Sequence, residues 1–313
     1  PLYLFTWKIA PAIATGNTVV AKPSEITPMT AYLFSKICKK AGLPDGVLNI
    51  VHGYGHKVGA SMSKHPGIKA ISFTGGTKTG ETIARTAAPL FKKLSLELGG
   101  KNPNVIFADC DFEKALKTTL LSSFSNQGQI CLCGSRIFIE RPIYEKFKTA
   151  FVKATEELVV GDPNSPSSNL GALVSKEHLE KVLSYVELAK KEGGKVLAGG
   201  NRVQLEDANC KNGNFMRPTV IEGLPYDCRT NQEEIFGPVV TITPFENEEQ
   251  VINYANSTKY GLSSTVWTQS TTKAQRFAQE IEAGIVWINC WLVRDLRTPC
   301  LLYTSDAADD TRS

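Results

Sequence analysis

Residues 96–131 read LELGGKNPNVIFADCDFEKALKTTLLSSFSNQGQIC and place a carboxylate and a thiol at the ends of predicted elements. The apolar run at 105–108 predicts a strand, and the amphipathic run at 111–124 predicts a helix. Glu97 precedes the strand, and Cys131 ends the glycine-containing loop after the helix. Side chains at such ends can be aimed into a cleft. This pair suits chemistry that needs a nucleophile and a base that activates water.

The alternation of strands and helices continues on both sides of this stretch. Further predicted strands lie at 17–22, 47–51, 70–73, 94–98, 135–140, 239–245, 263–267 and 284–289. Further predicted helices lie at 28–41, 54–63, 143–158, 176–192, 248–256 and 272–283, with one more that ends at Ala87. Strands that alternate with helices are typical of parallel sheets with helices on both faces. We therefore predict an α/β fold of two lobes joined near Gly99 and Gly100.

The composition excludes several classes of protein. The chain has 313 residues, 42% of them apolar and 21% charged, and a formal net charge of +4. These values are typical of a soluble two-domain protein without a nucleic-acid groove or a membrane span. The eight cysteines form no regular framework, which favours reduced thiols and a cytoplasmic location. The four histidines lack metal-ligand spacing, so we expect no metal site.

Two glycine-rich turns follow predicted strands. GYGHKVG at 53–59 has its third glycine one residue late for a dinucleotide fingerprint, and a plain tight turn explains it equally well. FTGGTKTG at 73–80 would expose backbone N–H groups at a helix N-terminus, where phosphate binds. The two turns together favour dinucleotide binding more strongly than either turn does alone.

Two further groups of residues each have two interpretations. In KPSE at 22–25, the carboxylate of Glu25 could accept hydrogen bonds from ribose hydroxyls and would repel a 2′-phosphate. Such a carboxylate favours NAD over NADP. A solvated pair with Lys22 is the alternative. Cys131 could be an inert core thiol, but the loop of Asn, Gln and Gly before it favours an exposed, activated thiol.

Six motifs, in the same order, resemble the aldehyde dehydrogenase superfamily over residues 1–299. They are WKIAPA at 7–12, GNTVVAKPSE at 16–25, FTGGT at 73–77, LELGGK at 96–101, NQGQIC at 126–131 and EEIFGP at 233–238. The resemblance implies two Rossmann-like lobes with mostly parallel sheets, a partial NAD-binding domain at 1–98 and a catalytic domain at 99–299. Residues 300–313 fall outside it and lack periodicity, so we expect an artefactual or disordered tail.

The resemblance also implies roles for single residues. Cys131 matches the nucleophile and Glu97 the general base. The cofactor-binding residues that it implies are Lys22, Ser24, Glu25, Gly75, Gly76, Glu234 and Phe236. The KPSE residues match the adenosine-ribose site, and Glu234 matches the nicotinamide-ribose site. Gly76 stands where the family has a serine at the pyrophosphate, so a hydroxyl contact is lost there.

A narrower resemblance concerns CLC at 131–133 and NCWLVRDL at 289–296. Both are similar to the 2-aminomuconic and 2-hydroxymuconic semialdehyde dehydrogenases, whose substrates already carry a carboxylate. Arg294 is the candidate that would bind this carboxylate, and a surface pair with Asp295 is the alternative. Three other functions stay open: a broad-specificity aldehyde dehydrogenase, an acyl-transferring dehydrogenase that releases the acyl group to coenzyme A, and a catalytically silent nucleotide-binding homologue.

The resemblance also implies a mechanism in which Cys131 and Glu97 act on a small-molecule aldehyde substrate. Cys131 attacks the aldehyde carbon, hydride passes to NAD, and Glu97 activates the water that hydrolyses the thioester. The family's N-terminal segment, with its oxyanion-binding asparagine, and its subunit-bridging C-terminal strand have no match here. We therefore expect this chain by itself to be a fragment with little or no activity, and a homo-oligomer only for the full-length protein.

Overall fold

The computed structural model describes residues 1–293 and residue 295, so Arg294 and the expected tail at 300–313 lie outside the described residues. The chain divides into two compact units, Pro1–Leu98 and the residues from Gly99 onward. Each unit has its own strands and helices and is described here by itself.

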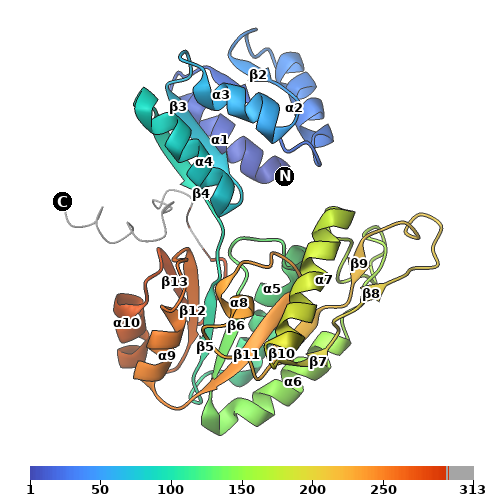
Figure 1. The fold of residues 1–313 in the computed structure, drawn as a ribbon, viewed down its shortest axis with the longest axis vertical. Helices are drawn as coiled ribbons and strands as arrows, with labels where there is room; N and C mark the ends of the chain where they lie inside the picture. The colour runs from blue at the N-terminus through green and yellow to red at the C-terminus, as the bar shows by residue number, and fades with distance from the viewer. Residues whose placement is uncertain (294, 296–313) are drawn as a thin grey trace. The chain divides into compact units, whose positions relative to one another are not determined.

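The first unit has four short strands with helices between them, drawn in blue to green in Figure 1. Its main elements are α1 (Leu2–Ala14), β1 (Val19–Ala21), α2 (Met29–Lys40), β2 (Leu48–Ile50), α3 (Ala60–Lys64), β3 (Ala70–Thr74), α4 (Thr77–Ala87) and β4 (Lys93–Glu97). β1 pairs with β2 and β3 with β4, both in parallel. A helix connects the two strands of each pair, as parallel pairing requires.

Two segments of this unit differ from the sequence prediction. No helix is predicted before residue 17, yet α1 forms there with Pro11 inside it. An interior proline removes a backbone hydrogen bond and argues against a helix, but the burial of Ile9 shows that packing outweighs this local preference. The helix expected at 54–63 begins as a π-helical turn, Gly55–Gly59, before α3. The two glycines of that turn are poor helix formers.

The second unit is built on a seven-stranded sheet with the order β13-β12-β5-β6-β11-β10-β7. Its strands are β5 (Pro103–Ile106), β6 (Arg136–Glu140), β7 (Lys195–Ala198), β10 (Thr219–Glu222), β11 (Val239–Phe245), β12 (Ser263–Trp267) and β13 (Ile285–Ile288). All neighbours are parallel except β7, which runs antiparallel to β10. The mostly parallel α/β architecture predicted from the sequence is thus confirmed, whereas β7 and β10 are not among the predicted strands. Each has only four residues, too few for a clear pattern.

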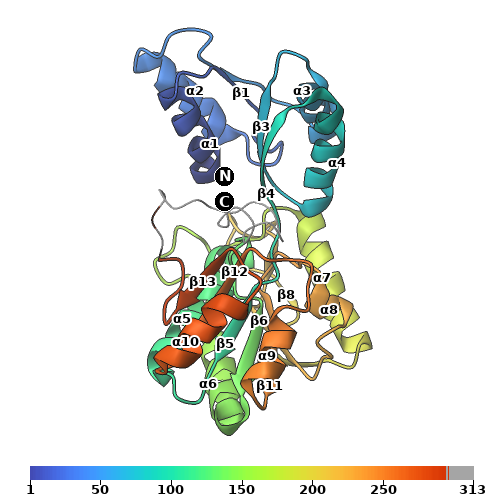
Figure 2. The same cartoon turned by 90° about the vertical axis from the view of Figure 1, so that its left-hand side faces the viewer.

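Helices cover both faces of this sheet, as Figures 1 and 2 show. One face carries α5 (Phe112–Phe124) and α6 (Tyr144–Glu156), and the other carries α7 (Lys176–Lys191), α9 (Glu248–Ala255) and α10 (Thr271–Glu280). Successive strand residues point to opposite faces. In β11, Val240 therefore packs in the cluster with α5 and α6, and Val239 packs in the cluster with α7.

Smaller elements complete the second unit. They are a short helix, α8 (Arg229–Gln232), and a hairpin of β8 (Arg202–Val203) with β9 (Phe215–Met216). Most residues between β8 and β9 are exposed. Among the helices of the described residues, none is both long enough and apolar enough to cross a membrane.

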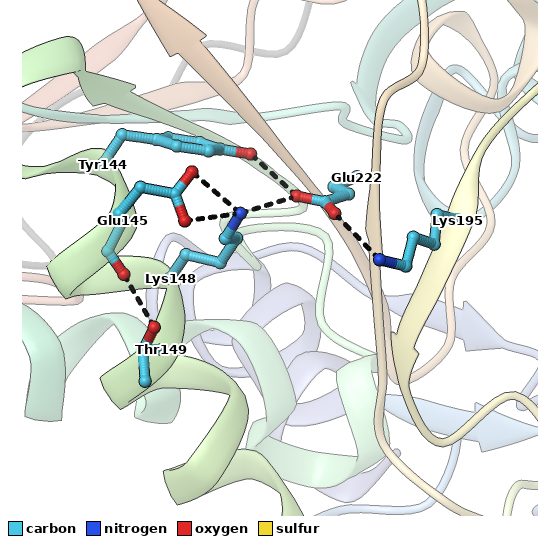
Figure 3. A network of polar contacts seen from close by, with 6 residues as sticks. All are labelled: Tyr144, Glu145, Lys148, Thr149, Lys195 and Glu222. Carbon is cyan, nitrogen blue, oxygen red and sulfur yellow. Dashed lines mark hydrogen bonds and ion pairs between the residues drawn. The ribbon is translucent and has the colours of Figure 1, made fainter.

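A polar network, drawn in Figure 3, joins α6 to one end of the sheet. The carboxylate of Glu222 on β10 accepts the Tyr144 hydroxyl at 3.3 Å and the Lys148 ammonium at 3.1 Å. Lys195 on β7 lies 3.9 Å from the same carboxylate. Burial, together with the charge of Glu222, raises the pKa of Tyr144 to about 12. One carboxylate thus connects a helix and two strands.

Candidate functional site

Three loops of the second unit meet at the amino-terminal edge of its sheet. Gly99 and Gly100 precede β5, Cys131 precedes β6, and Glu234 precedes β11. Because β5, β6 and β11 are neighbours and parallel, the chain enters all three strands from the same edge. The topology therefore brings the loops of Cys131 and Glu234, two residues singled out from the sequence, to one place.

The two glycines before β5 allow these loops to approach closely. The Gly100 N–H donates to Glu234 Oε1 at 3.0 Å. A Cβ at Gly99 would lie 2.8 Å from Cδ of Glu234, and one at Gly100 would lie 2.6 Å from the carbonyl oxygen of Cys131. A side chain at Gly99 would therefore displace the Glu234 carboxylate, and one at Gly100 would displace the Cys131 loop. Burial raises the pKa of the Glu234 carboxyl, and the Gly100 hydrogen bond partly opposes this.

The loop that carries Cys131 begins with an unusual turn. Asn126, Gln127 and Gly128 have φ values of 49°, 56° and 69°, so three residues in a row are left-handed. The Asn126 side chain donates to the carbonyl of Gln129 at 3.1 Å, which fits the tolerance of Asn for this conformation. A Cβ at Gly128 would overlap the Gly237 carbonyl. The thiol loop therefore lies directly on the loop that follows Glu234.

Asn102 holds the backbone of the thiol loop. This side chain is 3% exposed, and its amide donates to the carbonyls of Cys131 at 2.7 Å and Cys133 at 2.9 Å. Its oxygen accepts the Ser263 N–H at 3.2 Å. Both ends of the amide are therefore used, and one side chain fixes the thiol loop to the first residues of β5 and β12.

The two neighbouring thiols have different surroundings. Cys131 is half-buried beside an apolar cluster that includes Leu132 and Trp291, and the Trp291 indole donates to the Leu132 carbonyl at 3.0 Å. Cys133 is buried, and burial raises its pKa to about 12. Cys133 is therefore a neutral thiol at neutral pH, and Cys131 is the more accessible of the pair.

Phe236 lies in the same loop as Glu234 and is half-buried. Its backbone is left-handed, with a φ of 60°. His178 Nε2 of α7 lies 2.6 Å from its carbonyl oxygen. The two cofactor residues predicted in this loop thus stand on a segment with a defined and unusual backbone.

In the first unit, the KPSE motif and the glycine-rich turn after β2 come together. The Lys22 ammonium donates to the carbonyls of Pro23 at 2.5 Å and Gly53 at 3.1 Å and to Glu25 Oε2 at 3.2 Å. The Gly55 N–H donates to Glu25 Oε1 at 3.3 Å. A hydrogen bond from its own backbone N–H, followed by those from Lys22 and Gly55, lowers the pKa of the Glu25 carboxyl.

The second glycine-rich turn leaves the start of α4 open. Gly76 is the N-cap residue, and no side chain caps the helix. A Cβ at Gly76 would meet nothing within 4 Å, whereas one at Gly75 would overlap the ring of Phe73. The hydroxyls of Thr74 and Thr77 are buried beside this turn and have no hydrogen-bond partner among the described residues. Such a helix start offers donors to an anion.

Three predicted residues remain, and one of them lies outside the described residues. Ser24 is exposed, and its hydroxyl accepts a backbone N–H two residues further on at 3.3 Å. Glu97 is half-buried at the end of β4, in register with Thr74 of β3. It belongs to the first unit and Cys131 to the second, so each is described within its own unit. Arg294 lies outside the described residues.

Two buried polar residues of the site were not predicted from the sequence. They are Asn102 and its neighbour Lys101, which is 2% exposed. Burial, and then the charge of Arg136, lowers the pKa of Lys101 to about 7. The signal in the sequence was a pair of polar residues directly before an apolar strand. In the described part of the chain, no group of three or more His, Cys, Asp or Glu side chains could hold a metal ion.

Comparison with known proteins adds a family match and close relatives. Residues 1–300 match the family model described as "Aldehyde dehydrogenase family". The 2-aminomuconic semialdehyde dehydrogenase of Danio rerio is 54% identical over 301 residues, which are 96% of this chain and 62% of that protein. The 2-hydroxymuconic semialdehyde dehydrogenase of Pseudomonas sp. strain CF600 is 48% identical, over 95% of this chain and 61% of that protein.

A solved structure gives the same result at the level of the fold. The crystal structure of betaine aldehyde dehydrogenase from Staphylococcus aureus in complex with NAD+ superimposes with a TM-score of 0.93 at 41% identity. The match covers 97% of this chain and 60% of that one. The chain thus spans about three-fifths of the length of the relatives that it matches.

Proposed function

Because the chain belongs to the aldehyde dehydrogenase family, we propose that the whole protein oxidises an aldehyde to a carboxylic acid with NAD. One observation carries the proposal: the loop of Cys131 lies on the loop of Glu234, through Gly128 against Gly237 and Gly100 against both. In this proposal, residues 1–98 act as the NAD-binding domain and the residues from 99 onward as the catalytic domain.

Cys131 is the proposed nucleophile. Its thiolate forms a bond to the aldehyde carbon while the π electrons of the carbonyl move to oxygen, which gives a thiohemiacetal whose oxygen carries the negative charge of the former thiolate. Bound NAD would supply the acceptor for the hydride that leaves that carbon. The oxygen then reforms its double bond, which leaves a thioester on Cys131. The position of this thiol supports the role, because it is half-buried in a polar loop held by Asn102.

Glu97 is the proposed general base for the second half of the reaction. Its carboxylate takes a proton from water while the water oxygen bonds to the thioester carbon. The carbon–sulfur bond then breaks, which releases the acid and restores the thiolate of Cys131. The placement of Glu97 at the end of β4, where it is only half-buried, supports this role.

Residues of the first unit fit the adenosine ribose and pyrophosphate of NAD. The Lys22–Glu25 pair, with Ser24 beside it, offers a cation and a carboxylate on an open turn, and a carboxylate there favours a ribose hydroxyl over a 2′-phosphate. The Gly75–Gly76 turn suits the pyrophosphate, because α4 has no side-chain cap and two buried hydroxyls there have no partner among the described residues.

Residues of the second unit fit the nicotinamide end of the cofactor. The Glu234 carboxylate would accept the ribose hydroxyls, and Gly100 orients it through one oxygen and leaves the other for the ligand. Phe236, two residues further along the same loop, would lie near the nicotinamide. The half-burial of both side chains supports this assignment, because a binding surface needs access.

The proposed substrate is a semialdehyde that already carries a carboxylate, such as 2-aminomuconic semialdehyde. Support comes from the two semialdehyde dehydrogenases to which the chain is similar. Arg294 is the residue that we propose for the substrate carboxylate, since a guanidinium can bind it through two parallel hydrogen bonds. The alternative is a broad aldehyde dehydrogenase with no need for a carboxylate.

The test measures NADH formation by the whole protein with a carboxylated semialdehyde and with propanal. We expect no turnover from C131S, unchanged turnover from the control C38S, and an acyl adduct on Cys131, detectable by mass spectrometry, in E97Q. R294A should raise KM about tenfold or more for the carboxylated substrate alone, since a charged hydrogen bond contributes about 1.5–3 kcal/mol. A wild-type protein that forms no NADH, or an active C131S variant, contradicts the proposal.

A further inference from the structure

One side of α7 lies along the loop that carries Glu234. Residues spaced i, i+3, i+4 and i+7 line up on one face of a helix. The four residues of α7 with this spacing that face the loop are His178, Lys181, Val182 and Tyr185. His178 Nε2 lies 2.6 Å from the carbonyl oxygen of Phe236, and the Lys181 ammonium donates to the carbonyl of Glu234 at 3.3 Å.

The other two residues of this face extend the contact to both ends of the loop. A Cβ at Gly237 would lie 2.6 Å from Cγ2 of Val182, so the helix and the loop backbone touch there. The Tyr185 hydroxyl donates to the Glu233 carboxylate at 2.6 Å. The helix face therefore follows the loop over residues 233–237 and contacts side chain and backbone in turn.

Phe236 is the point in this loop that most needs a partner. Its φ of 60° is left-handed, which is strained for a bulky residue and persists only when the surroundings hold it. The hydrogen bond from His178 is made to the carbonyl of this same residue. The left-handed turn also sets the direction in which the chain leaves Glu234 and in which the Phe236 side chain points.

The chemistry of the contact defines the state of the imidazole. A carbonyl oxygen only accepts, so Nε2 must carry the hydrogen. Burial lowers the pKa of His178, which favours the neutral ring, although the Phe236 carbonyl opposes this shift. The imidazole and the Phe236 ring also meet in a T-shaped arrangement, with centroids 5.9 Å apart. The ring is thus held from two sides as the Nε2–H tautomer.

We propose that His178 is a positioning residue for cofactor binding, which holds Phe236 in its left-handed conformation and so keeps Glu234 aimed at the nicotinamide ribose and Phe236 placed near the nicotinamide. The inference rests on the proposed function for the identity of the ligand. The position of the loop, however, depends only on the contact between α7 and residues 233–237. The two parts can be measured separately.

The first experiment measures hydrogen–deuterium exchange over residues 233–239 in the 313-residue chain and needs no ligand. H178L removes the donor, whereas H178Q keeps an amide N–H at similar reach. We expect exchange in this segment to rise about tenfold in H178L and to stay within about threefold of wild type in H178Q. K176L, at an exposed position of the same helix, is the control. Equal exchange in H178L and wild type overturns the inference.

The second experiment records the tautomer of His178 by ¹⁵N NMR, with the resonance identified by its loss in H178Q. A hydrogen on Nε2 at neutral pH supports the inference, and a hydrogen on Nδ1 overturns it. This result does not depend on whether the protein binds any nucleotide.

The third experiment measures NAD kinetics in the whole protein. H178L should raise KM for NAD about tenfold while kcat stays within about twofold, and H178Q should restore KM. A merely structural role would lower the active fraction and kcat without a change in KM, and this outcome overturns the inference. A wild-type protein that does not reduce NAD refutes the proposed function, and the cofactor role of His178 with it. The hydrogen–deuterium exchange result distinguishes this failure from a loss of the contact between α7 and the loop.

Discussion

Asn102 Nδ2 lies 2.7 Å from the carbonyl oxygen of Cys131, so a side chain at the start of β5 fixes the backbone of the thiol loop. Asn102 lies outside all six sequence motifs, yet its side chain determines the position of the thiol loop. The same amide reaches Cys133 and Ser263. Its loss should therefore affect stability and thiol reactivity together.

Asn102→Ala should lower the free energy of unfolding by about 2–4 kcal/mol, since a buried group without a partner costs about 1–3 kcal/mol and three backbone groups lose theirs. Urea unfolding measures this, and the alkylation rate of Cys131 should change in parallel. Asn164→Ala, at an exposed position, is the control and should stay within about 0.5 kcal/mol. A similar small effect for Asn102→Ala would show that the contact has little energetic weight.

Gly128→Ala should destabilise the second unit by about 3 kcal/mol. The added Cβ would overlap the Gly237 carbonyl, and the φ of 69° adds strain for an L-residue. Gly193→Ala is the matched control, because its φ of 92° is also positive but its Cβ would meet nothing within 4 Å. The control should cost only about 1–2 kcal/mol. Equal losses in the two variants would mean that backbone strain, and not the contact between loops, explains the effect.

The lowered pKa of Lys101 predicts that the free energy of unfolding rises with pH. Its folded pKa of about 7 lies below the ordinary value of 10.5. Between these values the unfolded chain binds more protons than the folded one, so the free energy of unfolding rises with pH. The groups that shift this pKa through their charges are Arg136, Glu234, Cys228 and Glu233.

Lys101→Met should remove this rise, which we expect to be about 1–2 kcal/mol between pH 7 and pH 9. Tryptophan fluorescence during urea unfolding is a suitable measure, since Trp267, Trp287 and Trp291 all lie in the second unit. Lys190→Met, whose side chain is 49% exposed, serves as the control and should keep the wild-type slope. Parallel pH profiles for wild type and Lys101→Met would contradict the prediction.

Glu222→Gln should lower the free energy of unfolding by about 1–2 kcal/mol, because a carboxylate with hydrogen bonds from Tyr144 and Lys148 loses its charge (Figure 3). The Glu222 side chain is 18% exposed, so water screens the network only in part. In Glu145→Gln, an exposed partner of Lys148 changes, and the cost should stay below about 0.5 kcal/mol. If thermal unfolding ranks the two variants equally, the network contributes no more than a surface ion pair.

The sequence predicted features that depend on neighbours along the chain. The apolar run before Asp109 and the amphipathic run after it became β5 and α5, with Asp111 as the N-cap. The Cys131 and Glu234 loops meet because β5, β6 and β11 are neighbouring parallel strands. The alternation of strands and helices along the chain predicts such a parallel arrangement. The roles of Glu97 and Cys131, by contrast, stay predictions that await the kinetic test.

Features that depend on contacts far apart in sequence were not predictable. Asn102 binds carbonyl groups, which every residue has, so no side-chain pattern marks its partners. The left-handed Phe236 contacts α7 through its carbonyl oxygen, and nothing in EEIFGP distinguishes this residue. α1 forms despite Pro11 because tertiary packing outweighs local propensity.

The arrangement of the sheet also determines where the chain tolerates changes in length. The thiol and its neighbours stand where β5, β6 and β11 begin, so the connections that leave these strands, at 107–111, 141–143 and 246–247, lie at the far end. Phe107 is buried, but insertions or tags at exposed positions of these connections, such as Pro142 and Asn247, need not move Cys131 or Glu234. That end is therefore the natural place for a label or an immobilising linker, whereas lengthening the chain at 99–102, 125–135 or 233–238 would displace the loops of Cys131 and Glu234 directly.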